Sequence, residues 1–588
     1  MRANMAIDVN EPTGPASSMP SSPLPRQERG RFWRRGEPLV WATAGALAIM
    51  LLLVCVLLAV VMTNGLGVFW PSRVAEVVLR DGSRVLGERI RSQFNPDTGE
   101  TSVQFKTANR ELDPHRQDFR WIRQSDIVEV AYPEAVCVLE RLENGDFFGY
   151  LTSVAGPDVK APADRQTGDS PGQESALIQG LAAGLENVRA RAARELAPID
   201  RQLFLLANEL QRLRHQERRL RYRLGQWAEE GQPAADSPAE FERQLEAIQA
   251  AGDEVKRHSD ELVGRQTTLQ AELRRNVAVL STASGQEKSV PLGDVVRFYR
   301  PNAMGVLAKA RHYAAKIGEL LWENPRESNT EGGLFPAIFG TVMLIFLMAL
   351  TCFPLGVLAG IYLGEYAKEG LLVRIVRIAV NNLAGIPSIV YGIFGLGFFV
   401  YGMGGLIDRA FFPERVAANT PTFGTGGILW ASLTLGLLTV PVVIVSTEEA
   451  LRAIPRGVRE GSLALGATKF QTLSRVLLPM SLPGIMTGFI LAMARAAGEV
   501  APLMITGVVK LAPQLPIDGA FPYFHLDRKF MHLGFHIYDV GFQSPNVEAS
   551  KPMVYVTTLL LLLIVLVMTS VAIYLRNQMR KRYQLRTI

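Results

Sequence analysis

The residues with the clearest chemical potential are one cation and one anion inside an apolar segment. Arg495 and Glu499 are the only charged residues in 477–509, and their four-residue spacing predicts one shared helix face. Ionisable side chains are costly in hydrocarbon and mark functional sites. Because the planar guanidinium of arginine suits oxyanions, we predict that Arg495 lines an anion pathway and that Glu499 orients or gates it. A structural ion pair is the alternative.

The segment before this pair predicts two helices joined by a tight turn. Within 448–479 the helical pattern runs unbroken as far as Gly466, which can adopt a left-handed C-cap. Thr468 and Gln471 form a capping-box pattern that starts a second helix, and Pro479 is expected to end or kink it at the membrane surface. Such a rigid loop can push on a partner. An ordinary amphipathic connector is the alternative.

A third candidate site is a helix break in an apolar segment. Gly385, Pro387 and Ser388 interrupt the apolar run 378–399. Broken helices in transporters can expose backbone groups to ions, so these residues are candidates for the pathway, although a plain proline kink is the favoured interpretation. The histidines and the three widely separated cysteines do not predict a metal site or a disulfide framework.

Six apolar segments are long enough to cross a membrane. A spanning helix needs about 20 apolar residues, and 48% of the 588 residues are hydrophobic although 20% are charged. This composition fits a chain divided between membrane helices and a soluble part. The first segment is too long for a signal peptide and is expected to remain as an anchor. The predicted spans are 39–62, 334–363, 378–399, 427–445, 480–508 and 553–575.

Lysine and arginine are concentrated in the segments on one side of the predicted membrane. Basic residues precede the first span, lie between spans two and three and between spans four and five, and follow the sixth. Because positively charged loops stay in the cytoplasm, both termini are predicted to be cytoplasmic. The same rule places residues 64–331 in the periplasm of a bacterium, outside its inner membrane.

The predicted periplasmic segment has strand and helix patterns. Strand-like runs with turn signals at Asp81-Gly82 and Asn144-Gly145 cover 74–156. The sequence SDIVEVAYPE resembles the later GDVVRFYRPN, which indicates two β-barrel-like units in tandem. Between them, apolar residues recur every three or four positions in 175–275 and predict an antiparallel coiled-coil hairpin that interrupts the second unit. Self-packing of this hairpin and docking to a partner both stay open.

The predicted organisation follows from these patterns. The fold class is an all-α polytopic membrane protein joined to a β-rich periplasmic domain that carries the coiled coil. The predicted parts are a disordered cytoplasmic N-terminus (1–36), a first span (37–64), a periplasmic domain (70–302, β-rich over 74–156 and 277–302), a linker helix (303–331) and a membrane domain (332–588).

The loop also resembles a motif of a known transporter family. ATP-binding-cassette (ABC) importer permeases carry an EAA loop of the form E-A-A-x3-G-x9-I-x-L-P, and the sequence here has Glu460, Gly461, Ser462, Gly466 and Pro479 at the corresponding positions. Two alanines are replaced by glycine and serine, and the isoleucine by valine. GIPSIVYGIFGLGFFV and ARAAGEVAPLM further resemble the PstA-type permease of phosphate importers. The resemblance covers the first span and about 318–588.

The resemblance implies a function and a set of partners. It implies a six-helix type I permease subunit that moves inorganic phosphate and couples through 448–479 to a separate ATPase. The implied partners are a second permease, two ATPase copies and a periplasmic phosphate-binding protein. No cofactor is expected on this chain, which lacks a phosphate-binding G-x-x-x-x-G-K-[ST] loop, and no enzymatic activity is expected. A sulfate or molybdate permease, a membrane-anchored scaffold or sensor, and a passive channel are the alternatives.

Overall fold

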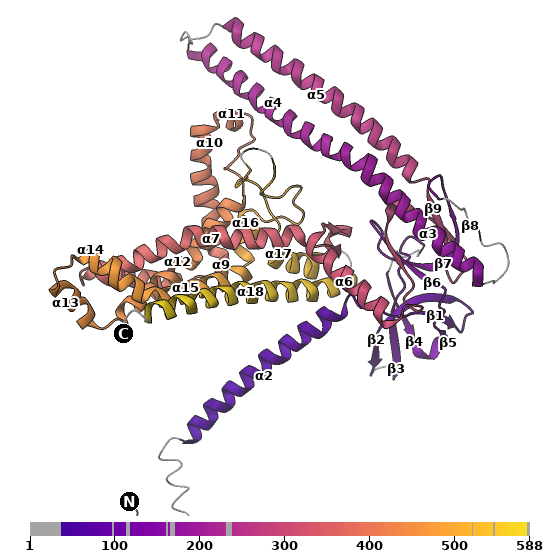
Figure 1. Cartoon of the computed structure of the whole chain (residues 1–588), viewed down its shortest axis with the longest axis horizontal. Coiled ribbons are helices and arrows are strands. Elements are labelled where there is room, and N and C mark those ends of the chain that lie inside the picture. Colours follow the sequence, from indigo (N-terminus) through magenta and orange to yellow (C-terminus); the bar gives the residue numbers. More distant parts are fainter. Residues whose placement is uncertain are drawn as a thin grey trace, which may run out of the picture. The chain divides into compact units, whose positions relative to one another are not determined.

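The computed structural model contains two compact units, Met1–Met62 and Thr63–Ile588. The predicted N-terminal segment 1–36 lies outside the described residues. Figure 1 labels the helices and strands in chain order. The described residues are 37–96, 99–112, 118–159, 163–164, 171–230, 238–519, 521, 523–544 and 547–584.

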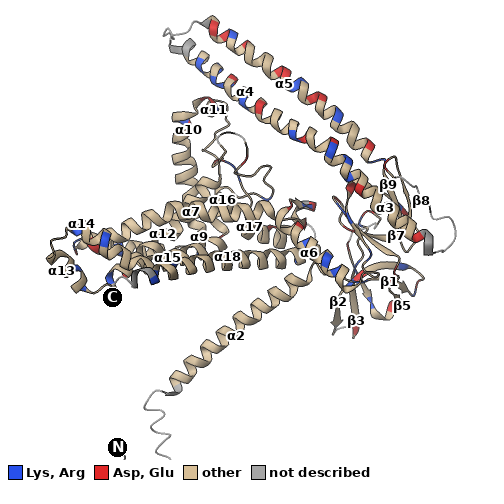
Figure 2. Cartoon of the chain, viewed as in Figure 1, with Lys and Arg blue, Asp and Glu red and all other residues tan. Residues whose placement is uncertain are grey.

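Six helices in the described part of the chain are long and apolar enough to cross a membrane, by length and composition. Their number agrees with the sequence prediction. In Figure 2 these helices are tan over most of their length, because they carry few charged residues. The candidate spans are Leu39–Gly67, Phe335–Tyr366, Ser388–Phe411, Ile428–Arg452, Lys469–Gly498 and Val547–Lys581.

The predicted bounds of spans three and five were wrong. Span three begins at Ser388, because a separate amphipathic helix, α8 (Leu371–Leu383), occupies the residues before it. The apolar side chains on one face of α8 are exposed, and their pattern resembled a span in the sequence. Span five ends at Gly498, ten residues before the predicted end, because the backbone of Glu499 is extended.

In the membrane part, short π-helical turns extend several of the helices. The π-helical turns are Tyr362–Tyr366, Gly395–Gly404, Leu473–Leu477 and Asp539–Gln543. The first unit contains most of α2 (Glu37–Gly67). The remaining helices are α7 (Phe335–Ile361), α9 (Ser388–Phe394), α10 (Gly405–Phe411), α11 (Pro413–Ala417), α12 (Ile428–Arg452), α13 (Arg456–Ala464), α14 (Lys469–Thr472), α15 (Leu478–Gly498), α16 (Ala501–Thr506), α17 (Leu533–Tyr538) and α18 (Val547–Gln584).

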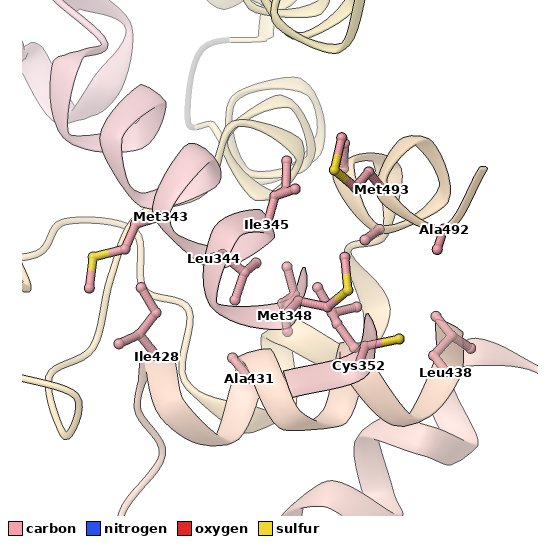
Figure 3. Close-up of a cluster of buried hydrophobic side chains, with 14 of the residues drawn as sticks. Met343, Leu344, Ile345, Met348, Cys352, Ile428, Ala431, Leu438, Ala492 and Met493 are labelled. Carbon is pink, nitrogen blue, oxygen red and sulfur yellow. The ribbon is translucent and has the colours of Figure 1, made fainter. Parts of the chain in front are cut away.

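Helices α7, α12 and α15 form the centre of the membrane part. Figure 3 shows methionine, leucine and isoleucine side chains of α7 facing residues of α12 and α15. Glycines allow α7 and α12 to approach closely: a Cβ atom on Gly356 would lie 2.7 Å from Val443, and one on Gly360 would lie 2.6 Å from Thr447. Small residues at four-residue spacing typically permit such close packing in membranes.

Two large β-sheets and one small two-stranded sheet (β12-β13) lie between the first and second candidate spans. The two large sheets are described first. The first has the strand order β4-β3-β2-β1-β5 and the second β10-β9-β7-β6-β11, with β8 paired to β7. Among the described strands both hydrogen-bonded paths are open, so neither sheet closes into a complete barrel. The strands are β1 (Val74–Leu79), β2 (Arg84–Asn95), β3 (Glu100–Lys106), β4 (Phe119–Arg123), β5 (Ile127–Ala131), β6 (Val136–Arg141), β7 (Phe147–Ala155), β8 (Ala163–Asp164), β9 (Val277–Ser281), β10 (Glu287–Pro291) and β11 (Val295–Tyr299).

The two sheets repeat one topology. In each, a hairpin of two strands is followed by a second hairpin, a short 3₁₀ turn and a last strand that returns to pair with the first. The strands β5 and β11 lie within the two similar sequences noted above. Gly82 and Gly145 have φ angles of 80° and 67° at the tips of the first hairpins, as tight turns between twisted strands require.

A long helical segment is inserted into the second sheet between β7 and β9. It consists of α3 (Pro171–Arg191), α4 (Ala197–Glu230) and α5 (Pro238–Leu273). Helices α4 and α5 lie side by side in opposite directions in Figure 1, and hydrogen bonds join Gln249 to Glu217 and Gln266 to Asp200. After β11, helix α6 (Val306–Trp322) and the short strands β12 (Pro325–Arg326) and β13 (Glu331–Gly332) lead into α7.

Candidate functional site

The predicted loop between spans four and five is a helix, a tight turn and a second helix. Gly466 has a φ angle of +85°, a conformation that glycine adopts without strain. Both hydrogen bonds of the predicted capping box are present: Gln471 N–H donates to Thr468 Oγ1 (3.2 Å) and Thr468 N–H donates to Gln471 Oε1 (2.9 Å). The turn between α13 and α14 is therefore rigid at both helix ends.

Two features of this loop differ from the prediction. The helix does not run unbroken to Gly466, because Pro455 begins a new helix, α13, after the turn that follows Arg452. At the other end, Pro479 does not end a helix, because Lys469–Gly498 is continuous; the alternative, a kink at Pro479, stays a prediction. The π-helical turn Leu473–Leu477 ends two positions before Pro479. Proline has no backbone N–H to donate, and the wider π-helical turn accommodates it within the helix.

The tip of the loop presents exposed side chains. Glu460 and Gly461 are exposed, and Ser462 is partly buried with its hydroxyl 2.9 Å from that of Thr472. Beside them, Leu465 is 90% exposed and Phe470 is 69% exposed. Single exposed apolar residues are common on protein surfaces, but here they lie around a rigid turn. This arrangement is suited to insertion into a groove of another protein.

The sequence analysis missed the residue that fixes this loop to the membrane part. Arg459, next to Glu460, donates to Glu365 in the π-helical turn that extends α7 (2.7 Å and 3.1 Å). It also donates to the carbonyl oxygens of Leu451 and Ile454 (2.6 Å and 2.7 Å). A planar guanidinium can make all these contacts at once. The sequence analysis assigned no functional role to Glu365, which lies 94 positions from Arg459. At this separation the sequence contains no local signal for the pair.

The Arg459→Met variant is expected to weaken the connection between the loop and α7. Methionine retains the apolar stem but removes charge-assisted hydrogen bonds worth roughly 1.5–3 kcal/mol each. If the loop transmits motion, transport should fall at least tenfold while the protein still inserts and folds. Transport and melting temperature should be measured together. The matched control is Arg456→Met on the same helix, whose exposed side chain shows no ion pair in the described residues; equal effects would contradict the anchoring role.

Arg495 and Glu499 are brought together at the end of α15. The Nε atom of Arg495 lies 3.6 Å from Oε1 of Glu499, and the two side chains are 34% and 20% exposed. This is an ion pair but is longer than a hydrogen bond. The predicted four-residue spacing brings the two side chains together at the C-terminal end of α15. Glu499 is the C-cap residue of this helix, and its ψ angle of 132° turns the chain out of the helix only after it. The carboxylate therefore lies at the break between α15 and α16.

Gly385, Pro387 and Ser388 do not interrupt a span. They lie between α8 and α9, where the N–H of Gly385 donates to the carbonyl oxygen of Asn382 and Pro387 precedes the first residue of α9. The favoured interpretation, a proline kink within a span, was therefore wrong. These residues turn the chain from an amphipathic helix into span three.

Basic residues gather at one end of the membrane part. Arg377 contacts Glu448 (2.9 Å), so the segment between spans two and three meets the C-terminal end of span four. In Figure 1 the C-terminal end of α18 lies near α13 at the same end of the bundle, and Figure 2 shows basic residues there. Three of the four predicted basic segments thus lie on one side, as the predicted orientation requires.

Residues 356–581 match the family model described as "binding-protein-dependent transport system inner membrane component". The probable ABC transporter permease protein YqgI of Bacillus subtilis is 32% identical over 225 residues, which cover 37% of this chain and 70% of that protein. The phosphate transport system permease protein PstA of Yersinia pestis is 38% identical over 185 residues, 31% of this chain and 56% of that one. The probable PstA of Methanocaldococcus jannaschii is 36% identical over 197 residues, 33% and 63%.

Among solved structures, the inward-facing MetNI methionine ABC transporter is similar over 42% of this chain and 95% of that chain, with 21% identity and a TM-score of 0.31. The chain spans between about half and 70% of the length of the curated relatives it matches. The two β-sheets and the inserted helices lie outside residues 356–581.

YqgI is 32% identical to this chain, which covers 70% of its length, and this similarity defines the class of protein. The chain belongs to the family of ABC transporter permease proteins. Within that family it is similar to permeases of the PstA type.

Proposed function

We propose that this chain is the transmembrane subunit of an importer that moves inorganic phosphate across the bacterial inner membrane. Its termini are cytoplasmic, and residues 64–331 are periplasmic. ATP is bound and hydrolysed on a separate subunit, so this chain is not itself an enzyme and carries no cofactor. A second related permease and a phosphate-binding protein complete the assembly.

The observation that carries this proposal is the geometry of the loop over 448–479. A rigid turn at Gly466 exposes Glu460 and Leu465, and Arg459 connects the same helix to the end of α7. An ATPase that binds the exposed tip transmits its motion through α13 to the membrane helices. Without such a connection, movement of the ATPase would deform the loop and leave the pathway unchanged.

Phosphate is the proposed substrate because several relatives are named as phosphate permeases. Arg495 supports an anion, since its guanidinium is partly exposed and held near Glu499 at 3.6 Å, outside hydrogen-bond range. An incoming oxyanion therefore meets a guanidinium that donates no hydrogen bond within the described part of the chain. This chemistry suits sulfate and molybdate equally, so another oxyanion is the second candidate substrate.

The test is uptake of labelled phosphate in phosphate-starved cells that lack this gene. Cells would receive the wild type, Glu460→Ala, or the control Glu449→Ala, which removes an exposed glutamate before the loop turns. We expect uptake only with the wild type and the control, and no competition from excess sulfate or molybdate. Competition by either anion would reassign the substrate.

Two further outcomes would reject the transport role. Uptake that survives Glu460→Ala and needs no ATPase subunit would indicate a passive channel. Uptake unaffected by deletion of the gene, in cells without another phosphate importer, would favour a scaffold or sensor that acts through the residues between spans one and two.

A further inference from the structure

The two β-sheets correspond residue by residue, which allows one to be used as a template for the other. In the first sheet Val130 is opposite Val77 and Arg89 is opposite Phe105; in the second, Phe298 is opposite Leu139 and Leu151 is opposite Leu280. Both sheets have register shifts at the same places, between β2 and β3 as between β7 and β9, and between β1 and β5 as between β6 and β11. Shared irregularities of this kind show that the sheets are structural equivalents.

In the second sheet one face is covered by a helix of the same chain. Helix α3 packs against β7, and its apolar residues are almost fully buried. At its start, Glu174 forms an ion pair with Arg300 directly after β11 (2.8 Å). The apolar residues follow the spacing of one helix face: Leu177, Leu181, Leu185 and Val188.

The equivalent face of the first sheet has no helix over it among the described residues. In the second sheet, α3 lies in the connection between β7 and β9. The equivalent connection in the first sheet, between β2 and β3, is only the turn between Asn95 and Glu100. A groove of about 260 Å³ occupies this position, with Val103 and Phe105 at its base. Val130 is 44% exposed and Tyr132 is 46% exposed, whereas Phe298, the equivalent of Val130, is partly buried and packs against the core beneath α3.

The groove is apolar at its centre and basic at its sides. Arg89 and Arg120 lie directly across from Phe105 on the two neighbouring strands, so all three side chains are on the groove face. Both arginines are exposed and have no ion pair in the described part of the chain. In the second sheet the equivalent of Arg89 is Leu151, which lies in the core with the α3 leucines.

We propose that this groove binds an amphipathic helix of another protein, which lies on the first sheet as α3 lies on the second. The helix carries apolar residues at the four-, four- and three-residue steps seen in α3. It also carries an acidic residue that faces Arg89 and Arg120. An extended strand fits less well, because the template face of the second sheet is covered by a helix.

The test is site-specific photocrosslinking of the full-length chain in cells. p-Benzoylphenylalanine would replace Val130, and mass spectrometry would identify the crosslinked peptide. We expect a peptide of a different protein with the helical apolar spacing and acidic residues described above. The same probe at Tyr132 should give the same peptide, and Val130→Asp should reduce that crosslink at least tenfold.

Two matched positions make every outcome informative. The probe at Phe298 should crosslink to the chain's own 171–191 segment, which shows that both sheets are folded. The probe at Glu129, on the opposite face of β5, should not give the partner peptide. The proposal is wrong if the Val130 probe crosslinks only to a second copy of this chain, to a peptide without that helical pattern, or to nothing while the Phe298 probe reports α3.

Discussion

Phosphate uptake is expected to fall below a tenth of the wild-type rate when Arg495 is replaced by alanine, although the complex still assembles and hydrolyses ATP. Arg495 is partly exposed, and its neighbour Glu499 follows a break in the backbone. The substitution removes the cation and leaves a carboxylate beside the proposed anion path. Both changes raise the free energy of phosphate in the pathway, since charge interactions are strong where water is scarce.

The measurement is labelled-phosphate uptake and ATP hydrolysis by the purified complex in proteoliposomes. Arg495→Lys keeps the charge but not the planar fork, so we expect partial activity. The double variant Arg495→Ala with Glu499→Gln separates two explanations. If it restores uptake, the single variant failed because of an unpaired carboxylate and the pair is structural; normal uptake by Arg495→Ala alone would exclude the pathway role.

The second large effect is expected in the contact between α7 and α12. Gly360→Ala places a Cβ atom 2.6 Å from the Cβ of Thr447 and 2.8 Å from the carbonyl oxygen of Ile444. Because real Cβ atoms do not approach so closely, α7 and α12 must separate, and overpacking of this kind costs about 1–3 kcal/mol. Gly360→Leu should cost more and prevent stable insertion of the two helices as a pair.

The control lies one turn further along the same helical face. Gly364→Ala places its Cβ atom 3.5 Å from the nearest side-chain atom, which is ordinary van der Waals contact. Alanine favours a helix over glycine by about 1 kcal/mol at either position, so the difference between the two variants reports packing. Thermal unfolding in detergent should show a lower melting temperature only for Gly360→Ala. Equal melting temperatures would mean that the helices do not pack as closely as described.

Local sequence signals predicted local structure well. The capping box at Thr468, the left-handed Gly466 and the turns at Gly82 and Gly145 depend on residues within a few positions of one another. The similarity between β5 and β11 was visible because a repeated topology retains repeated apolar spacing. Six apolar segments were also visible, since the length of a span follows from the thickness of the bilayer.

Other features could not be read from the sequence, because tertiary contacts decide them. The exposed apolar face of α8 has the composition of a span, so the start of span three was placed ten residues too early. The end of α15 at Gly498 was missed because the apolar run continues beyond it, although a glycine followed by Pro502 is typical of a helix end. The contact between Arg459 and Glu365 joins distant segments and carries no local pattern.

The position of the inserted helices has a consequence for the order of folding. About 120 residues separate Ala155 from Val277, which pair across β7 and β9, whereas only about nine separate the equivalent Gln93 and Ser102. For a flexible chain this difference adds roughly 2 kcal/mol of loop-closure entropy. The first sheet can therefore form early from nearby residues. The second must wait until α4 and α5 pair, because only that hairpin returns the chain to its starting point.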